Sequence, residues 1–173
     1  ADVPVLGPEG NRAAIAGHQG IIANPDCSTI ILVLALQPLH RRAGLQSVVV
    51  STYQAASGAG QRAMDEMHAA TRAVLAGEAP PKPDALAQSL AFNLFPHVDV
   101  FMDDGFTREE DKMLFEVRKI LDMPALTVDA TCVRVPVARC HSESVAVKLE
   151  KNLTVTEARE VFGSSPGLTE LDP

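Results

Sequence analysis

The chain has 173 residues, 46% of them hydrophobic, and a formal net charge of −7 at pH 7. This length and hydrophobic content allow one globular domain with a core and exclude an intrinsically disordered chain. The acidic balance, without a basic cluster, argues against a nucleic-acid partner or an anionic membrane surface. The apolar run at residues 30–36 is too short to span a bilayer.

The three cysteines, Cys27, Cys132 and Cys140, form no Cys-x-x-Cys pair. The sequence therefore predicts neither a disulfide framework nor a metal site, and a reducing cytoplasm is the expected location.

Residues 1–19 are rich in proline and glycine and predict an irregular lead-in with one helical turn around residues 11–15. The short apolar run at 20–23 predicts a strand. An Asn-Pro-Asp turn then leads into a long apolar helix that begins at about Cys27. We expect Pro38 to kink or stop this helix.

Residues 45–54 are rich in β-branched side chains and predict a strand, which the glycine-containing segment 57–60 ends. Apolar side chains near one helical face predict a helix over 61–76. Short extended pieces are expected at 91–96 and 98–101.

Thr107 and Glu110 fit a capping box that opens a helix. Further on, the sequence predicts two long strands and a last helix, at 126–137, 142–151 and 154–162. This order of elements predicts an α+β fold: a mixed, largely antiparallel sheet with helices on one face.

Cys27 is the candidate nucleophile, because its thiol is expected at the N-terminus of a helix. Free backbone N–H groups and the helix dipole favour a negative sulfur there, so the pKa of Cys27 is expected to fall. A buried structural cysteine is the alternative.

Several stretches resemble bacterial aspartate-β-semialdehyde dehydrogenase. Residues 20–29 read Gly-Ile-Ile-Ala-Asn-Pro-Asp-Cys-Ser-Thr, and residues 48–60 read Val-Val-Val-Ser-Thr-Tyr-Gln-Ala-Ala-Ser-Gly-Ala-Gly. Residues 101–113 and 131–143 resemble later motifs of the same family. The resemblance covers nearly the whole chain.

The resemblance implies a single catalytic and dimerisation domain over residues 1–173, similar to the catalytic domain of glyceraldehyde-3-phosphate dehydrogenase. It implies NADP-dependent reduction of L-aspartyl-4-phosphate to the semialdehyde, on the route to lysine, threonine and methionine. The family also has a nucleotide-binding domain and a C-terminal segment. We therefore expect this chain to be the central part of a larger homodimeric enzyme and to be inactive alone.

The family's catalytic residues match Cys27, His141 and Gln54. Histidine suits proton transfer because its pKa lies near neutrality. The resemblance implies that His141 assists thiol ionisation and that Gln54 orients the substrate. Without the resemblance, His141 and Gln54 would be read as ordinary structural residues.

Three charged residues match the family's substrate-binding groups: Arg134 for the α-carboxylate, Glu109 for the ammonium group and Lys112 for the phosphate. Arg134 lies in a β-rich segment, where an unpaired guanidinium would be costly, so pairing with a carboxylate is expected. A structural ion pair for Arg134, and a solvated surface pair for Glu109 and Lys112, are the alternatives.

Gly58 to Ala63 formally fit the dinucleotide fingerprint G-x-G-x-x-A, with Glu78 as the acidic residue further on. Because Glu78 lies in a proline-rich linker and not on a second strand, we expect no Rossmann unit here. The resemblance instead places Ser57 and Gly58 at the nicotinamide end of NADP.

Asp26 departs from the family, which usually has asparagine before the nucleophile. If it faces the substrate phosphate, a carboxylate there would repel that group and raise the pKa of the thiol. Cys140 beside His141 is also atypical and is interpreted as a spectator that is prone to oxidation.

Two alternatives stay open. N-acetyl-γ-glutamyl-phosphate reductase also places a cysteine after an Asn-Pro turn, although its motif favours Gly-Cys-Tyr over the Asp-Cys-Ser found here. The chain could also serve as a non-catalytic dimerisation module.

Overall fold

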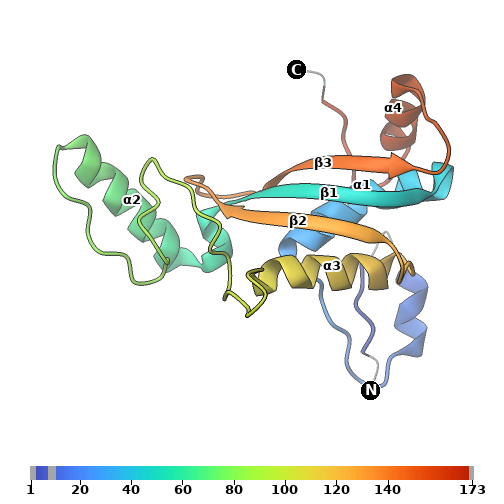
Figure 1. Ribbon diagram of the computed structural model, residues 1–173, viewed down its shortest axis with the longest axis horizontal. Coiled ribbons are helices and arrows are strands. Elements are labelled where there is room, and N and C mark those ends of the chain that lie inside the picture. Colours follow the sequence, from blue (N-terminus) through green and yellow to red (C-terminus); the bar gives the residue numbers. More distant parts are fainter. Residues whose placement is uncertain (1–2, 8–10, 172–173) are drawn as a thin grey trace. The chain divides into compact units, whose positions relative to one another are not determined.

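A three-stranded sheet organises the described part of the chain, residues 3–7 and 11–171 of a computed structural model (Figure 1). Its strands are β1 (Leu45–Gln54), β2 (Thr127–Arg134) and β3 (Ser142–Leu149), in the spatial order β2-β1-β3. The Val135 N–H donates to the carbonyl of Gln54, so β1 and β2 end side by side and are parallel. The Glu150 N–H donates to the carbonyl of Gly44, so β3 runs antiparallel to β1. The predicted mixed sheet is confirmed.

The four helices that the sequence predicts are present. They are α1 (Cys27–Ala43), α2 (Gln61–Leu75), α3 (Arg108–Ile120) and α4 (Val155–Gly163). Two 3₁₀ helices, η1 (Arg12–Gly17) and η2 (Ala56–Ala59), lie in the lead-in and after β1. The α+β fold class is therefore confirmed.

Local side chains explain where the helices begin and end. The Asp26 carboxylate caps α1, and reciprocal hydrogen bonds between Thr154 and Glu157 form a capping box at α4. Gly44 ends α1 with a φ of 71°, a left-handed conformation that side-chain-bearing residues rarely adopt.

Two details of the predicted elements are wrong, and a third is wrong in part. Residues 20–23 form no strand; Ala23 makes only an isolated parallel bridge to Val5. The pieces at 91–96 and 98–101 likewise contribute only isolated bridges, at Phe95 and Phe101. Pro38 lies inside α1 and does not stop it, because the helix continues to Ala43; a kink at Pro38 stays a prediction. One proline removes a single backbone donor, and packing along the helix can outweigh that loss.

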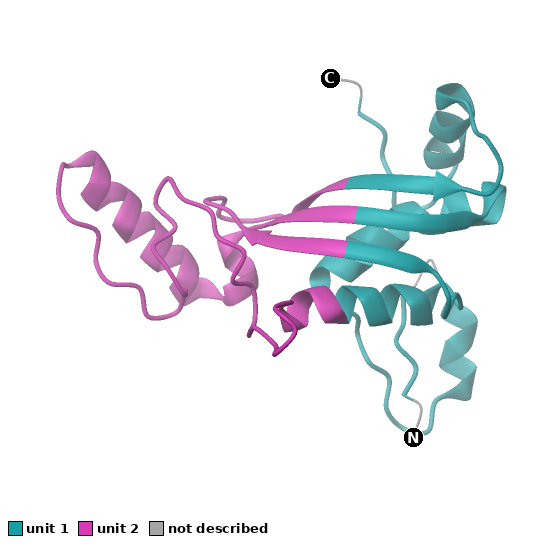
Figure 2. Ribbon diagram, viewed as in Figure 1, with its two compact units in different colours: residues 1–49, 112–129, 145–173 teal, residues 50–111, 130–144 magenta. Residues whose placement is uncertain are grey.

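The chain divides into two compact units, coloured in Figure 2. Unit 1 comprises residues 1–49, 112–129 and 145–173, and unit 2 comprises residues 50–111 and 130–144. Buried apolar side chains from α1, α3 and the strands fill unit 1: Leu32, Leu36, Leu45, Val48, Met113 and Val117. In unit 2 the core cluster is Ala56, Ala63, Met64, Met67, Leu86, Leu90 and Phe95. A single domain over 1–173 stays a prediction.

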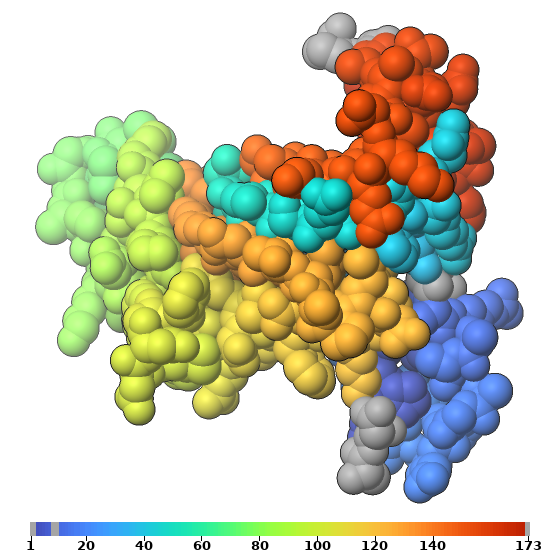
Figure 3. Space-filling model, turned by 45° about the vertical axis from the view of Figure 1, so that its right-hand side comes forward, coloured from blue at the N-terminus to red at the C-terminus, as the bar shows by residue number. Residues whose placement is uncertain are grey.

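One face of the sheet is covered and the other is open. Buried and exposed positions alternate along much of β1 and throughout β2. On the open face of β1, Val49 is 52% exposed and Tyr53 is 42% exposed. Figure 3 shows side chains of this strand, in cyan, uncovered at the surface. The sheet thus presents apolar side chains on its outer side.

Candidate functional site

Cys27 is the first residue of α1 in unit 1, and its side chain is exposed. The preceding Asp26 turns its carboxylate back onto the helix, where Oδ2 accepts a hydrogen bond of 3.0 Å from the Ser28 N–H. The same oxygen lies 3.9 Å from Sγ of Cys27. The structure therefore places an exposed thiol at a helix N-terminus, next to a carboxylate that is occupied in capping.

A second carboxylate holds the turn before Cys27. Glu116 on α3 accepts a hydrogen bond of 2.8 Å from the Asp26 N–H through Oε2. No local pattern predicts this contact, since the two residues are 90 positions apart. Lys112, the residue predicted to bind the phosphate, also lies in unit 1, on α3.

Unit 2 brings together four of the predicted site residues. Gln54 ends β1, Glu109 lies in the first turn of α3, Arg134 ends β2, and His141 directly precedes β3. Gln54, Glu109 and Arg134 are 1%, 6% and 7% exposed, so each of these polar groups is withdrawn from water. Nε2 of Gln54 donates to Oε1 of Glu109 at 3.1 Å.

The peptide groups around Ala55 anchor the other two members of this cluster. The Ala55 N–H donates to Nδ1 of His141 at 3.0 Å, and the Ala55 carbonyl accepts from Nη1 of Arg134 at 2.8 Å. Because Nδ1 accepts, the neutral imidazole carries its hydrogen on Nε2. Burial and then the nearby charge of Arg134 lower the pKa of His141, while Glu109 acts to raise it. The neutral ring is therefore favoured.

Gly58 lies against this cluster and is itself exposed. A Cβ built on Gly58 would come within 3.1 Å of Nη1 of Arg134 and of Cε1 and Nε2 of His141. A side chain at this position would press on both groups, so the absence of one keeps the surface beside the imidazole open. Ser57, half-buried, donates its N–H to the carbonyl of Ala138.

The glycine loop is not a dinucleotide-binding βαβ unit. After α2 the chain turns, with the Glu78 N–H bonded to the carbonyl of Ala73, and the next strand in chain order is β2. Glu78 therefore does not lie on the strand that a Rossmann fold requires.

The unit 2 cluster has the chemistry to bind a small charged molecule. It combines a buried carboxylate, a buried guanidinium and an imidazole whose neutral form is favoured. A ligand with both an ammonium and a carboxylate group would find an opposite charge for each.

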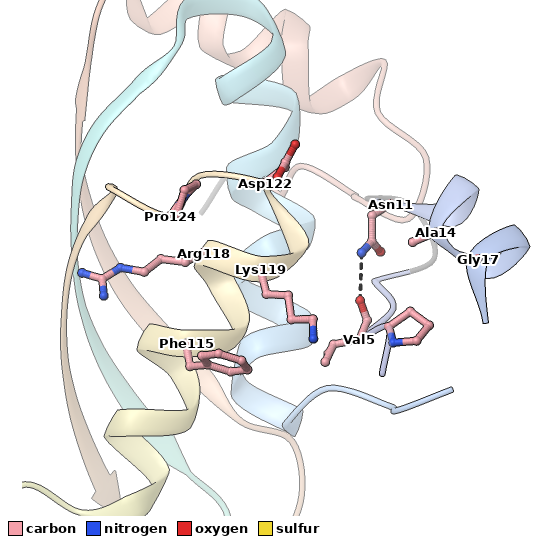
Figure 4. A pocket seen from close by; sticks show the side chains of 10 residues that line it. Val5, Asn11, Ala14, Gly17, Phe115, Arg118, Lys119, Asp122 and Pro124 are labelled. Carbon is pink, nitrogen blue, oxygen red and sulfur yellow. Dashed lines mark hydrogen bonds between the residues drawn. The ribbon is translucent and has the colours of Figure 1, made fainter. Parts of the chain in front are cut away.

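A separate cavity of about 690 Å³ lies in unit 1, lined in part by Asn11, Arg118 and Lys119 (Figure 4). Asn11, Arg118 and Lys119 each donate to a backbone carbonyl of the chain itself. Asn11 donates to the Val5 carbonyl at 2.8 Å, as the dashed line shows, and Lys119 donates to the Val3 carbonyl at 2.7 Å. We therefore attribute a structural role to this lining.

Residues 36–170 match the protein family described as "Semialdehyde dehydrogenase, dimerisation domain". The matched range contains the four members of the unit 2 cluster, whereas Asp26 and Cys27 precede it. Within the described residues, no helix is both long and apolar enough to cross a membrane.

Curated relatives extend the similarity to the thiol. Aspartate-semialdehyde dehydrogenase of Aquifex aeolicus is 47% identical over 99% of this chain and 51% of its own length. The Bacillus subtilis protein of the same name is 44% identical, again over 99% and 51%. The chain spans about half the length of these relatives.

A solved structure shows the same fold. Aspartate semialdehyde dehydrogenase II from Vibrio cholerae, complexed with ASA, is similar with a TM-score of 0.92 and 38% sequence identity. The match covers 95% of this chain and 49% of that one.

Proposed function

The chain belongs to the family of semialdehyde dehydrogenase dimerisation domains, and we propose that it supplies the catalytic residues of an aspartate-semialdehyde dehydrogenase. The reaction would be the NADP-dependent reductive dephosphorylation of L-aspartyl-4-phosphate to L-aspartate-4-semialdehyde. The observation that carries this proposal is that buried Glu109, buried Arg134 and His141 lie in one cluster around Gln54 and Ala55. The names of the relatives at 44–47% identity support it.

Cys27 is the nucleophile in this proposal. Its thiolate attacks the acyl carbon, the phosphate leaves with the electrons of the broken C–O bond, and a thioester remains. Hydride then adds to the thioester carbon, and the C–S bond breaks to release the aldehyde and the thiolate. The covalent intermediate divides one difficult reduction into two displacements at one carbon. The exposed position at the start of α1 suits this role.

His141 serves as the acid and base. The hydrogen bond from Ala55 to Nδ1 directs the proton of the neutral ring to Nε2. We propose that Nε2 exchanges a proton first with the thiol and later with the oxygen of the reduced intermediate. Gln54 orients the substrate through its side-chain amide.

The substrate carries an ammonium, a carboxylate and a phosphate, and the proposal assigns one charged residue to each. Glu109 binds the ammonium group, Arg134 the α-carboxylate and Lys112 the phosphate. Asp26 is also assigned to the phosphate side, where its charge would be unfavourable. A bidentate guanidinium contact suits a carboxylate in geometry as well as in charge.

Ser57 and Gly58 fit the nicotinamide end of NADP. Gly58 is exposed and has no side chain, so a flat ring can approach the backbone where a Cβ would otherwise contact His141 and Arg134. The cofactor supplies the hydride when bound. The role of this chain is to shape the surface that receives the ring.

We further propose a cytoplasmic homodimer that uses the open face of the sheet. The dimerisation description of the family and the exposed Val49 and Tyr53 on β1 support this arrangement. Val49 and Tyr53 take no part in the proposed reaction. A chain without a nucleotide-binding domain could therefore still serve as a dimerisation module.

The test is an assay of the enzyme produced from the complete coding sequence, with L-aspartate-4-semialdehyde, NADP and phosphate. We expect NADPH formation that Cys27→Ala abolishes. N-acetyl-L-glutamate-5-semialdehyde is the matched substrate control, because its amide nitrogen carries no charge for Glu109. Preference for the acetylated substrate would replace the proposed reaction with that of the N-acetyl-γ-glutamyl-phosphate reductases.

A further inference from the structure

The outer edge of β2 is closed by groups from outside the sheet. β2 is an edge strand, and edge strands present backbone N–H groups that need partners. Two backbone N–H groups of β2, two positions apart, have hydrogen-bond partners in unit 2 that lie outside the sheet. The Arg134 N–H donates to the carbonyl of Phe95 at 2.8 Å, and the Cys132 N–H donates to Oε1 of Glu110 at 2.9 Å.

Glu110 uses its other oxygen to cap α3. Oε2 accepts a hydrogen bond of 2.8 Å from the Thr107 N–H, and the Glu110 N–H lies 3.4 Å from Oγ1 of Thr107. This is the capping box that the sequence predicts. One carboxylate therefore accepts hydrogen bonds both from the residue that precedes α3 and from the edge of β2.

The chain contains a second capping box that lacks this link. At α4, Oε2 of Glu157 accepts from the Thr154 N–H at 2.8 Å, as Glu110 does at α3. The other oxygen of Glu157 lies 3.5 Å from Nη2 of Arg42, an exposed side chain of α1. The two glutamates share the capping role and differ in what the second oxygen holds.

We propose that Glu110 is a positioning residue that fixes Glu109 relative to Arg134. Glu109 directly precedes Glu110, and Arg134 lies two residues after Cys132 on β2. The inference rests on the proposed function, in which Glu109 and Arg134 bind the ammonium and the carboxylate of one substrate. The spacing between these two groups of the ligand is fixed, so the two side chains must be held in register.

Two substitutions separate the link from the charge. Glu110→Gln keeps the length of the side chain but offers one acceptor oxygen, so one of the two N–H groups loses its partner. Glu110→Asp keeps the charge and both oxygens but is one methylene shorter, so it cannot span both donors. Glu157→Gln is the matched control, because it weakens a capping box of the same kind at α4.

The measurement compares kcat/KM for L-aspartate-4-semialdehyde with that for succinate semialdehyde, which retains the carboxylate and lacks the ammonium group. The enzyme from the complete coding sequence is used. In Glu110→Gln and Glu110→Asp, we expect the preference for the aminated substrate to fall at least fivefold. In Glu157→Gln it should stay within twofold of the wild-type value.

A purely structural role would lower kcat/KM for both substrates equally, and an unchanged preference in the Glu110 variants would overturn the proposal. A wild-type preference in Glu110→Asp alone would also overturn it, since charge and not the two-point link would then matter. If the wild-type enzyme does not oxidise L-aspartate-4-semialdehyde, the proposed function itself fails, and this is visible before any variant is made.

Discussion

The Ala55 N–H donates to Nδ1 of His141 at 3.0 Å, and this one bond selects the protonation state of the ring. A protonated imidazole would carry hydrogen on both nitrogens and could not accept it. Burial and the charge of Arg134 act in the same direction on the pKa of His141. Backbone geometry and electrostatics thus agree in favouring the neutral form.

Stability should consequently depend on pH through His141. Its pKa is lowered from 6.5 in the folded state, so the unfolded chain takes up the proton first as the pH falls. The contribution of the neutral ring to the free energy of unfolding is fully present above pH 6.5 and is lost as the pH drops toward the folded-state pKa. Urea denaturation between about pH 7.5 and pH 5 should show a steeper loss of stability for the wild type than for His141→Gln.

An independent check is the NMR titration of the His141 ring. Its midpoint should lie below 6.5, the ordinary value for this side chain. A midpoint above that value would contradict both the accepted hydrogen bond and the effect of burial.

Cys27 should be the first thiol to react with iodoacetamide near neutral pH. It is exposed at the start of α1, whereas Cys132 is buried and Cys140 is exposed outside any helix. Peptide mapping by mass spectrometry identifies the labelled residue, and Cys27→Ser should remove the fast phase. Faster labelling of Cys132 or Cys140 would remove the basis for Cys27 as the nucleophile.

Asp26→Asn should raise kcat/KM of the complete enzyme about tenfold, which corresponds to relief of roughly 1.4 kcal/mol of repulsion toward the phosphate. The oxygen of asparagine can still accept from the Ser28 N–H, so Tm should be unchanged. Asp26→Ala is the control that loses the cap, at a cost of about 1 kcal/mol. An unchanged or lower kcat/KM in Asp26→Asn would show that the carboxylate does not oppose the substrate.

Gly58→Ala should lower kcat/KM by about tenfold, because the new methyl group must displace the His141 ring or the Arg134 guanidinium by a few tenths of an ångström. Because the His141 ring is displaced or its neighbour Arg134 moves, the titration midpoint of His141 should also differ from that of the wild type. Gly163→Ala is the matched control, since a Cβ on Gly163 meets nothing within 4 Å. Equal activity of the two variants would mean that the surface beside His141 tolerates a side chain.

Much of the fold could be predicted because the helices and β1 carry local signals. Asp26, Thr107 and Thr154 mark helix starts through bonds to residues two or three positions away. The strand predicted at 20–23 does not form, because a strand depends on a neighbouring strand and Ala23 makes only one bridge, to Val5. Apolar composition alone could not reveal that.

The resemblance to the family predicts which residues form the site, but it does not predict the hydrogen bonds that hold them. Gln54, Glu109, Arg134 and His141 could be named from motifs. The sequence could not show that Glu110 reaches Cys132, 22 positions away, or that Glu116 reaches the Asp26 N–H. Such contacts depend on how distant segments are packed, and short patterns contain no information about that.

The uncovered face of β1 has a consequence for every one of these measurements. If the exposed Val49 and Tyr53 are covered by a second copy, folding and association are coupled by mass action. The apparent Tm then rises with protein concentration, and a substitution far from that face can weaken self-association merely by destabilising the monomer. Each variant should therefore be compared with the wild type over the same series of protein concentrations. This comparison separates an effect on the stability of the subunit from an effect on dimerisation.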